Sequence, residues 1–495
     1  MRLVLSHAIN QTTEYIELMT KEKRKKFGQF FTSMETAAFM ASLYDIPEGM
    51  NEISILDAGA GSGILSCAFL ERLESIQTIQ VINLTCYENN QDVLELLRKN
   101  LQYCQEYSNK IINFNICNEN YITKQSKDFQ SDNENAQKYD YIIGNPPYKK
   151  IAKDAIEALS MPSVCYGAPN LYFLFAAMSL FNLKTNGEMV YIIPRSWTSG
   201  AYFKKFREYF LTKGKLRNIH LFVSRNKVFE AEDVLQETII IKVEKTVNEK
   251  ETIRITSTAS NQDFDNITEL YVPYNLVVAG NDMYVYLVTK QEEVDILNKI
   301  HKFHETLPQI GLKMKTGLTV DFRNKDALRN KDEKTAVPLF YAQHIKKGRI
   351  HFPIQKDNEY IVTEKNGLLQ ENKNYLFVKR FTSKEENRRL QCGIYLSKDY
   401  SQYLKISTQN KINFIENLLG DMSECLVYGL YVIFNSTIYD NYYRILNGST
   451  QVNSTEINSM PIPSLEEIKK MGTELLKSQD LSEHNCNLIL EEYCE

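Results

Sequence analysis

Short apolar runs alternate with longer helix-like segments through the first half of this 495-residue chain. The apolar runs span residues 53–57, 81–87, 139–144, 189–194 and 238–242, and the helix-like segments span residues 64–75, 92–107 and 171–181. Strands that alternate with helices are typical of βαβ units, whose parallel strands are covered by helices on both faces. The sequence therefore predicts an α/β fold for this half.

The pattern changes after a polar stretch at residues 243–251, VEKTVNEKE, which we interpret as a linker. Beyond it, short strand-like pieces are mixed with polar turns, at residues 252–255, 339–342, 375–378 and 393–396. A chain of this length is normally divided between more than one core. We expect two domains, residues 1–245 and residues 250–495, with the second of mixed α/β type.

Composition limits the location and the chemistry of the protein. No apolar run approaches the roughly 20 residues that span a bilayer, and the N-terminus lacks a signal-peptide pattern, so we expect a soluble, cytoplasmic protein without a membrane partner. The nine cysteines form no CxxC pair, which predicts no metal site. The net charge of −4 does not exclude a nucleic-acid partner, because residues 461–495 alone hold eight acidic and three basic residues.

A glycine-rich loop, DAGAGSG at residues 57–63, follows the first predicted strand. Gly59, Gly61 and Gly63 allow a tight turn whose N–H groups can approach a ligand. Glu88 ends the next predicted strand, where a carboxylate commonly accepts hydrogen bonds from a ribose diol. The loop lacks the GK[ST] ending of a P-loop, so a triphosphate is not expected. The alternatives are glycines that serve packing alone and a solvated glutamate.

The tetrapeptide Asn145-Pro146-Pro147-Tyr148 directly follows the predicted strand at residues 139–144. The Asn145 side-chain carbonyl and the Pro146 main-chain carbonyl can accept the two hydrogens of an exocyclic amine, which frees its lone pair for attack on a methyl donor. Tyr148 offers a flat face on which a planar base can stack. The alternative is a rigid Pro-Pro turn with an incidental tyrosine.

These motifs, in this order, resemble the gamma class of DNA adenine-N6 methyltransferases of the bacterial restriction-modification type. The glycine loop is similar to the family's S-adenosylmethionine loop, and the tetrapeptide to its catalytic motif. Further similar stretches are residues 26–32 (KFGQFFT, motif X), 170–172 and 187–194 (motifs V and VI) and 228–230 (motif VIII). The resemblance implies a class I, Rossmann-like S-adenosylmethionine-dependent methyltransferase domain and a target-recognition domain. S-adenosyl-L-methionine is the implied cofactor and S-adenosyl-L-homocysteine the product.

The resemblance also assigns residues to roles. The implied catalytic residues are Asn145, Pro146, Pro147, Tyr148 and Phe229. Phe229 would stack on the flipped adenine opposite Tyr148, with Phe222 as the runner-up and a plain core phenylalanine as a third interpretation. The implied cofactor-binding residues are Phe31, Thr32, Asp57, Ala58, Gly59, Gly61, Gly63, Glu88, Asn120, Tyr121 and Asn145.

Two of these cofactor assignments have local alternatives. Asn120 and Tyr121 occupy the position where the family usually has an aspartate and an aromatic residue, and Asn118 and Glu119 compete for that position. Thr32 and Glu35 match a T-x-x-E capping box, so the motif X segment is either a cofactor contact or only the cap of a helix over residues 33–43.

Basic residues gather at two places in the second half, residues 346–349 (KKGR) and residues 379–389 (KRFTSKEENRR). Basic residues mixed with aromatic and hydroxyl side chains suit phosphate contacts and base-edge reading, and the alternative is a solvated face. With the resemblance added, the expected DNA-binding residues are Lys346, Lys347, Arg349, Lys379, Arg380, Arg388, Arg389 and Gln451.

We therefore predict a site-specific methyltransferase that acts on N6 of a flipped-out adenine in double-stranded DNA, within a restriction-modification system. An RNA adenine-N6 methyltransferase, a protein-glutamine methyltransferase and a non-catalytic DNA-binding specificity protein are the rival hypotheses. Protein-glutamine enzymes are much shorter, and the intact tetrapeptide and glycine loop disfavour a non-catalytic protein. Double-stranded DNA is the expected partner, and a cognate restriction endonuclease is a further candidate. The sequence predicts neither the recognition sequence nor the oligomeric state.

Overall fold

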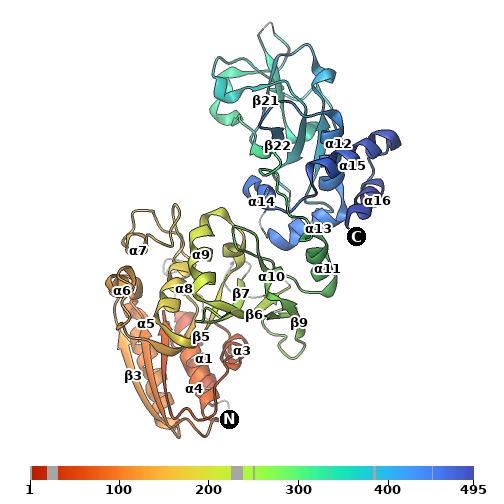
Figure 1. Cartoon of the computed structure of the whole chain (residues 1–495). Helices are drawn as coiled ribbons and strands as arrows, with labels where there is room; N and C mark the ends of the chain where they lie inside the picture. Colours follow the sequence, from red (N-terminus) through yellow and green to blue (C-terminus); the bar gives the residue numbers. More distant parts are fainter. Residues whose placement is uncertain are drawn as a thin grey trace. The chain divides into compact units, whose positions relative to one another are not determined.

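The chain divides into two compact units, Met1–Thr289 and Lys290–Glu495 (Figure 1). The computed structural model describes residues 3–18, 20, 32–223, 238–248, 251–333, 335–382, 386–448 and 450–494. No helix within these ranges is both long enough and apolar enough to cross a membrane. Nor do three or more His, Cys, Asp or Glu side chains of these ranges gather as a metal site requires.

The first unit is built around a nine-stranded sheet with the order β3-β2-β1-β4-β5-β7-β6-β8-β9. Its strands are β1 (Glu52–Ala58), β2 (Val81–Tyr87), β3 (Ile111–Cys117), β4 (Tyr139–Gly144), β5 (Leu183–Pro194), β6 (Lys215–Phe222), β7 (Thr238–Glu244), β8 (Thr252–Thr258) and β9 (Thr268–Pro273). The five strands from β3 to β5 are parallel, and β7 is antiparallel to both of its neighbours. The order reverses between β1 and β4, so ligands are expected at the carboxyl ends of these two strands.

Helices cover both faces of this sheet (Figure 1). One set packs together on one face: α1 (Leu3–Leu18), α3 (Met34–Ser42), α4 (Ile64–Leu73) and α5 (Gln91–Tyr107). The other set packs on the opposite face: α6 (Tyr121–Gln130), α7 (Ile156–Ser160), α8 (Leu171–Asn182) and α9 (Lys204–Lys213). Between α8 and α9 lie η1 (Arg195–Thr198) and η2 (Ala201–Phe203). The predicted α/β architecture is confirmed, because central strands such as β4 and β7 are buried on both faces as their apolar sequences require.

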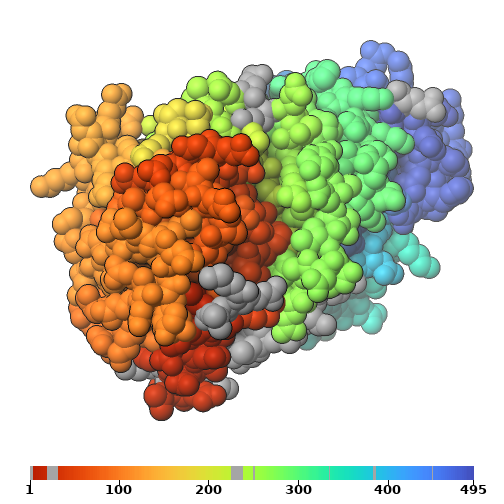
Figure 2. Space-filling view, turned by 90° about the horizontal axis from the view of Figure 1, so that it is seen from below, coloured from red at the N-terminus to blue at the C-terminus, as the bar shows by residue number. Residues whose placement is uncertain are grey.

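The predicted domain boundary at residues 245–250 is wrong. The polar stretch at residues 243–251 joins β7 to β8, and β8 pairs with β6 inside the same sheet. The ring of Phe264, which follows β8, stacks on Phe39 of α3 with 4.6 Å between centroids. Figure 2 accordingly shows the light-green residues of β8 and β9 beside the red N-terminal segments. The remainder of the first unit holds α10 (Tyr274–Val277), β10 (Val278–Ala279) and β11 (Tyr284–Val285).

The second unit is of mixed α/β type, as predicted. It begins with α11 (Gln291–Ile300) and holds a six-stranded sheet, β12-β22-β19-β20-β16-β15, and a five-stranded sheet, β13-β17-β14-β21-β18. The strands are β12 (Leu312–Thr316), β13 (Leu328–Arg329), β14 (Val337–Phe340), β15 (Ile345–Lys346), β16 (Arg349–Ile350), β17 (Tyr360–Ile361), β18 (Gln370–Glu371), β19 (Tyr375–Lys379), β20 (Cys392–Tyr395), β21 (Lys405–Thr408) and β22 (Ile412–Asn417). The helices that follow are α12 (Glu424–Asn435), α13 (Thr437–Leu446), α14 (Ser454–Ser459), α15 (Leu465–Ser478) and α16 (Glu483–Cys494).

Candidate active site

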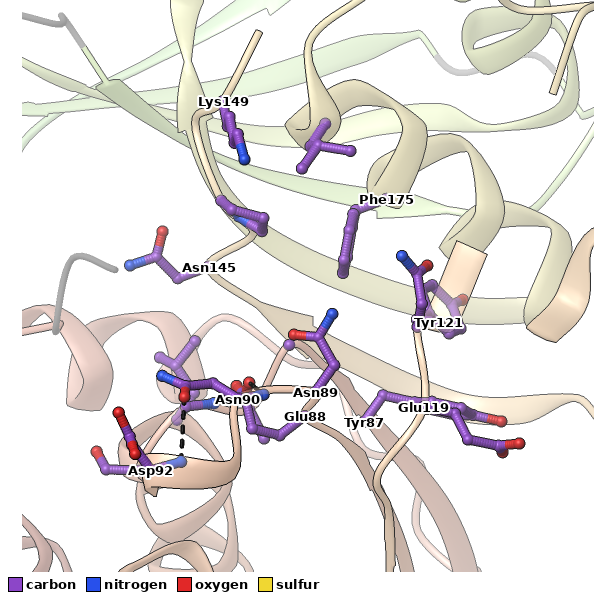
Figure 3. Close-up of a pocket in the computed structure, with 18 of the residues that line it drawn as sticks. Tyr87, Glu88, Asn89, Asn90, Asp92, Glu119, Tyr121, Asn145, Lys149 and Phe175 are labelled. Atoms are coloured by element: carbon purple, nitrogen blue, oxygen red, sulfur yellow. Dashed lines mark hydrogen bonds between the residues drawn. The ribbon is translucent and has the colours of Figure 1, made fainter. Parts of the chain in front are cut away.

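A cavity of about 620 Å³ lies at the carboxyl edge of the first unit's sheet (Figure 3). Its wall combines the loops that follow β1, β2, β3 and β4 with the start of α8. The residues that line it include Thr32, Gly59, Gly61, Glu88, Asn90, Glu119, Asn120, Tyr121, Asn145, Pro147, Lys149, Leu171 and Phe175. A volume of this size is typical of small-molecule and cofactor sites.

The glycine loop lines part of the cavity. Gly59 and Gly61 line the wall with φ of +94° and +54°, a backbone region that side chains rarely tolerate. The Gly59 N–H donates to the carbonyl of Tyr87 at 2.8 Å, which ties the loop to the end of β2. Gly63 lies beneath the wall, where an added Cβ would come within 2.8 Å of Leu97 Cδ1. Gly63 therefore serves the packing of α4 against α5, and its expected cofactor contact stays a prediction.

Asp57 and Ala58, two further expected cofactor contacts, do not line the cavity. Both are fully buried at the end of β1. The Asp57 carboxylate accepts a hydrogen bond from the Ser66 hydroxyl at 2.7 Å and so fixes the first turn of α4. Burial raises the pKa of Asp57 to about 7, and the nearby charge of Glu88 adds to the rise. These two residues support the loop from below instead of forming the wall.

Glu88 lies in the wall and also holds the loop together. One carboxylate oxygen accepts a hydrogen bond from the Gly61 N–H at 2.9 Å, and the other accepts from the Asn90 N–H at 2.7 Å. Burial raises the pKa of this carboxyl group, while the two backbone donors oppose that rise. Each oxygen keeps a further lone pair that a ligand hydroxyl can use.

Asn120 lines the cavity and is also the N-cap of α6. Its side-chain carbonyl accepts hydrogen bonds from the N–H groups of Ile122 and Thr123, at 3.1 and 3.2 Å, and its amide donates to Glu157 at 2.9 Å. The Asn120 side-chain carbonyl is therefore engaged by the first turn of α6, in keeping with the preference of asparagine for helix caps. The competing candidate Glu119 is a wall residue and pairs with Lys124 at 2.8 Å.

Aromatic rings form one side of the cavity (Figure 3). The ring of Tyr121 lies 5.1 Å from that of Tyr87 and 5.6 Å from that of Phe175. Its hydroxyl donates to the Asn182 side chain at 2.8 Å, so the ring is held in place. Sequence reasoning missed Phe175 because α8 is apolar all round and gives no signal for which ring faces the cavity.

The tetrapeptide stands at the carboxyl end of β4 with Asn145 and Pro147 in the wall and Pro146 buried. The Asn145 amide donates to the Thr32 hydroxyl at 3.1 Å. The Tyr148 hydroxyl donates toward the Asn145 side-chain carbonyl at 2.9 Å and the Ile192 carbonyl at 3.0 Å. This anchoring of Asn145 by Tyr148 was not predicted, since the sequence suggested only a stacking role for the ring. Burial raises the pKa of Tyr148 well above its usual value, which keeps this hydroxyl protonated.

The predicted T-x-x-E capping box at Thr32 is wrong. The N-cap of α3 is Ser33, whose hydroxyl accepts from the Thr36 N–H at 3.3 Å. The Thr32 hydroxyl thus remains available to Asn145. Phe31 and Phe229, together with the rest of the motif X and motif VIII matches, lie outside the described residues. The alternative to Phe229, Phe222, packs edge-on against His220 and Phe264 in the core.

The basic residues of the second unit fall into two groups. Lys346, Lys347 and Arg349 are exposed on the hairpin of β15 and β16. The second group is engaged by its own unit. Lys379 donates to the Gln391 side chain at 2.8 Å, and Arg380 donates to the carbonyl of Asn410 and the side chain of Gln451, at 3.0 and 3.2 Å.

Arg389 is buried, which is at odds with its expected contact with DNA, and the DNA contact of the partly exposed Arg388 stays a prediction. Arg389 has no exposed surface and lies against the Tyr443 ring, with a hydrogen bond to the Thr382 hydroxyl at 3.2 Å. Arg388 forms an ion pair with Glu483 at 2.7 Å and donates to the carbonyl of Ser436. Both guanidinium groups hold the second unit together, and the sequence could not distinguish them from surface cations because burial is a property of the tertiary fold.

The chain is similar to known methyltransferases and restriction-modification enzymes. Residues 66–229 match the model of the Eco57I restriction-modification methylase family. The chain is 34% identical to the type II methyltransferase M.PstI of Providencia stuartii and 33% identical to the type II methyltransferase M.BsuBI of Bacillus subtilis, in each case over 91% of this chain and 90% of the relative. A solved structure of the type IIL restriction-modification enzyme MmeI in complex with DNA has a similar fold, with a TM-score of 0.52, 12% identity, and coverage of 96% of this chain and 69% of that one.

Proposed function

Because the chain belongs to the type II restriction-modification methyltransferases, which methylate DNA with S-adenosylmethionine as cofactor, we propose that it transfers the methyl group to N6 of a flipped-out adenine in a specific double-stranded sequence. The observation that carries this proposal is the shared wall of one cavity. Asn145, the amine acceptor, and the Gly59–Gly61 loop with Glu88, the expected cofactor contacts, line the same space.

The wall residues fit S-adenosylmethionine. The Asn90 side-chain nitrogen lies buried at the wall without a hydrogen-bond acceptor among the described residues, and a polar ligand atom would satisfy it. The Glu88 carboxylate suits a ribose diol, and the rings of Tyr121 and Phe175 suit a planar purine. When bound, the cofactor supplies an electrophilic sulfonium methyl group.

The chain's own residues would position and polarise the target amine. The Tyr148 hydroxyl orients the Asn145 side-chain carbonyl, which is proposed to accept one hydrogen of the target amine. The Pro146 carbonyl, whose direction the following proline restricts, can accept the second hydrogen. With both hydrogens held, the nitrogen lone pair would be free to attack the methyl carbon. The N–C bond would form as the S–C bond of the sulfonium breaks, S-adenosyl-L-homocysteine would leave, and the methylated amine would release one proton to solvent. Alignment and electrostatic stabilisation account for the catalysis.

We assign the two units different roles in this proposal. Met1–Thr289 holds the catalytic cavity, and Lys290–Glu495 is proposed to recognise the target sequence. The exposed cations of the β15–β16 hairpin support this assignment, because surface lysines and arginines suit phosphate contacts. A cognate endonuclease that cleaves the unmethylated sequence would complete the system.

The substitution Asn145→Ala tests the proposal. We expect loss of tritium transfer from labelled S-adenosylmethionine to DNA by at least a hundredfold, with duplex binding within threefold of wild type. Asn109→Ala, at an exposed asparagine between α5 and β3, is the matched control and should leave transfer unchanged. Transfer at the wild-type rate by the Asn145→Ala protein would contradict the assignment.

A further inference from the structure

The chain leaves the catalytic tetrapeptide along an excursion, residues 152–168, that returns to the same edge of the cavity. The Ile151 N–H donates to the Pro169 carbonyl and the Leu171 N–H donates to the Lys149 carbonyl, both at 2.8 Å. Lys149 and Leu171 are wall residues, and Figure 3 shows Lys149 and Asn145 across the cavity from Glu88. The paired ends therefore fix residues 152–168, which we call the rim excursion, beside the active site.

Two exposed tyrosines from separate segments stand together on this edge. Tyr166 of the rim excursion is 58% exposed and Tyr202 of η2 is 63% exposed, and their ring centroids lie 6.5 Å apart. The Tyr202 ring is held against Gly167, where an added Cβ would approach its Cδ1 to 3.3 Å. Ile156 and Leu159 on α7 add exposed apolar surface. A patch of this kind next to a binding site usually marks an interaction surface.

The segments that carry these rings are rich in exposed lysines. Within residues 149–168 and 201–208, the exposed basic residues are Lys149, Lys150, Lys153, Lys204 and Lys205, and the exposed acidic residues are Asp154 and Glu208. Lys204 is paired with Asp282 at 2.7 Å. The charge of Lys205 opposes the rise that burial causes in the pKa of the Cys165 thiol, which precedes Tyr166 in the chain. The edge thus combines open aromatic faces with an excess of positive charge.

We propose that the rim excursion and η2 together bind the DNA strand next to the extruded base, with Tyr166 and Tyr202 stacking on neighbouring bases and the lysines contacting phosphates. Aromatic faces interleaved with cations are the combination by which proteins hold unpaired strands. The inference rests on the proposed function, since extrusion of a nucleotide leaves its neighbours without a stacking partner that a tyrosine can replace. The catalytic unit would then contribute directly to DNA affinity.

The double substitution Tyr166→Ala and Tyr202→Ala tests this surface. The probe is a fluorescent 30-base-pair duplex that carries the sequence which the wild-type protein methylates. We expect the Kd measured by anisotropy to rise about tenfold or more, because stacking on one base is worth that much. Binding of S-adenosylmethionine, measured by calorimetry without DNA, should be unchanged. The matched control is Tyr107→Ala with Tyr271→Ala, at tyrosines that are 54% and 66% exposed elsewhere in the unit, and should bind the duplex as wild type does.

A second variant keeps the test independent of the tyrosines. Lys153→Gln with Lys205→Gln should reduce the slope of log Kd against log salt by about 1.5 to 2. Wild-type affinity in the tyrosine variant together with a wild-type salt slope in the lysine variant would overturn the inference. A change of oligomeric mass in light scattering, with DNA affinity intact, would assign the surface to a protein partner and would also overturn it. If the wild-type protein itself neither binds nor methylates DNA, the proposed function fails first.

Discussion

The substitution Tyr148→Phe separates two roles that one residue combines. It keeps the ring that is proposed to stack on the target base and removes the hydroxyl that lies 2.9 Å from the Asn145 carbonyl oxygen and 3.0 Å from the Ile192 carbonyl oxygen. A hydrogen bond contributes about 0.5–1.5 kcal/mol net, and a buried acceptor left without a donor costs about 1–3 kcal/mol. The free energy that keeps the Asn145 side chain in its productive orientation should therefore fall by about 1.4–2.8 kcal/mol.

That loss corresponds to a fall of about ten- to a hundredfold in kcat. We expect the Kd for duplex DNA to stay within about twofold of wild type, because the ring remains. Burial keeps the Tyr148 hydroxyl protonated in the folded protein, so the ratio of the two kcat values should be flat between pH 6 and pH 9. The assay is tritium transfer at saturating DNA and cofactor, with anisotropy for the Kd.

The matched control is Tyr172→Phe. The Tyr172 hydroxyl is also buried, but it bonds to the Ser196 hydroxyl at 3.0 Å, and its ring meets that of Tyr148 edge-on. Removing this hydroxyl should lower kcat less than threefold. A Tyr148→Phe protein with wild-type kcat, or with a loss no larger than that of Tyr172→Phe, would refute the anchoring of Asn145.

Two further predictions concern stability and DNA binding. The pKa of Asp57 is raised from 3.8 to about 7, so the folded protein keeps a proton that the unfolded chain releases, and the free energy of unfolding should fall as pH rises from 4 to 7. In urea unfolding, Asp57→Asn should remove this pH dependence and add up to about 4 kcal/mol to the free energy of unfolding at pH 8. An unchanged pH dependence in the variant would refute this prediction. Arg389→Ala should lower the free energy of unfolding by about 3 kcal/mol, because the guanidinium is buried. Lys346→Gln with Lys347→Gln should leave the melting temperature unchanged and reduce the slope of log Kd for DNA against log salt by about 2. A stable Arg389→Ala protein, or a lysine variant that melts earlier with an unchanged salt slope, would contradict the assignment of these residues.

The parts of the fold that local patterns determine could be predicted from sequence. The expected strand at residues 81–87 is β2 as the structure has it, and the expected helix at residues 171–181 is α8, which ends one residue later. β3 was not predicted, because its sequence IINFNIC mixes asparagines with apolar residues. The domain boundary failed for a different reason. The polar turn after β7 looks like a linker, and only the pairing of β8 with β6 shows that the sheet continues.

In the candidate site, too, local motifs could be predicted from sequence and tertiary contacts could not. Residues that a motif names, such as Asn145, Glu88 and Gly61, line one cavity, and their roles there stay predictions. Contacts that depend on tertiary packing could not be predicted from the motifs. Asp57 and Arg389 are buried, and the position of Phe175 in the wall depends on how α8 is rotated against the sheet.

The central claim is that the cavity directs methyl transfer to N6 of adenine in DNA. The most direct test incubates duplex DNA with the wild-type protein and S-adenosylmethionine that carries a deuterated methyl group, digests the DNA to nucleosides and identifies the labelled nucleoside by mass spectrometry. We predict that the label appears in N6-methyladenine and that the Asn145→Ala protein gives none. Label found in N4-methylcytosine or 5-methylcytosine, or no labelled nucleoside with the wild-type protein, would contradict the account.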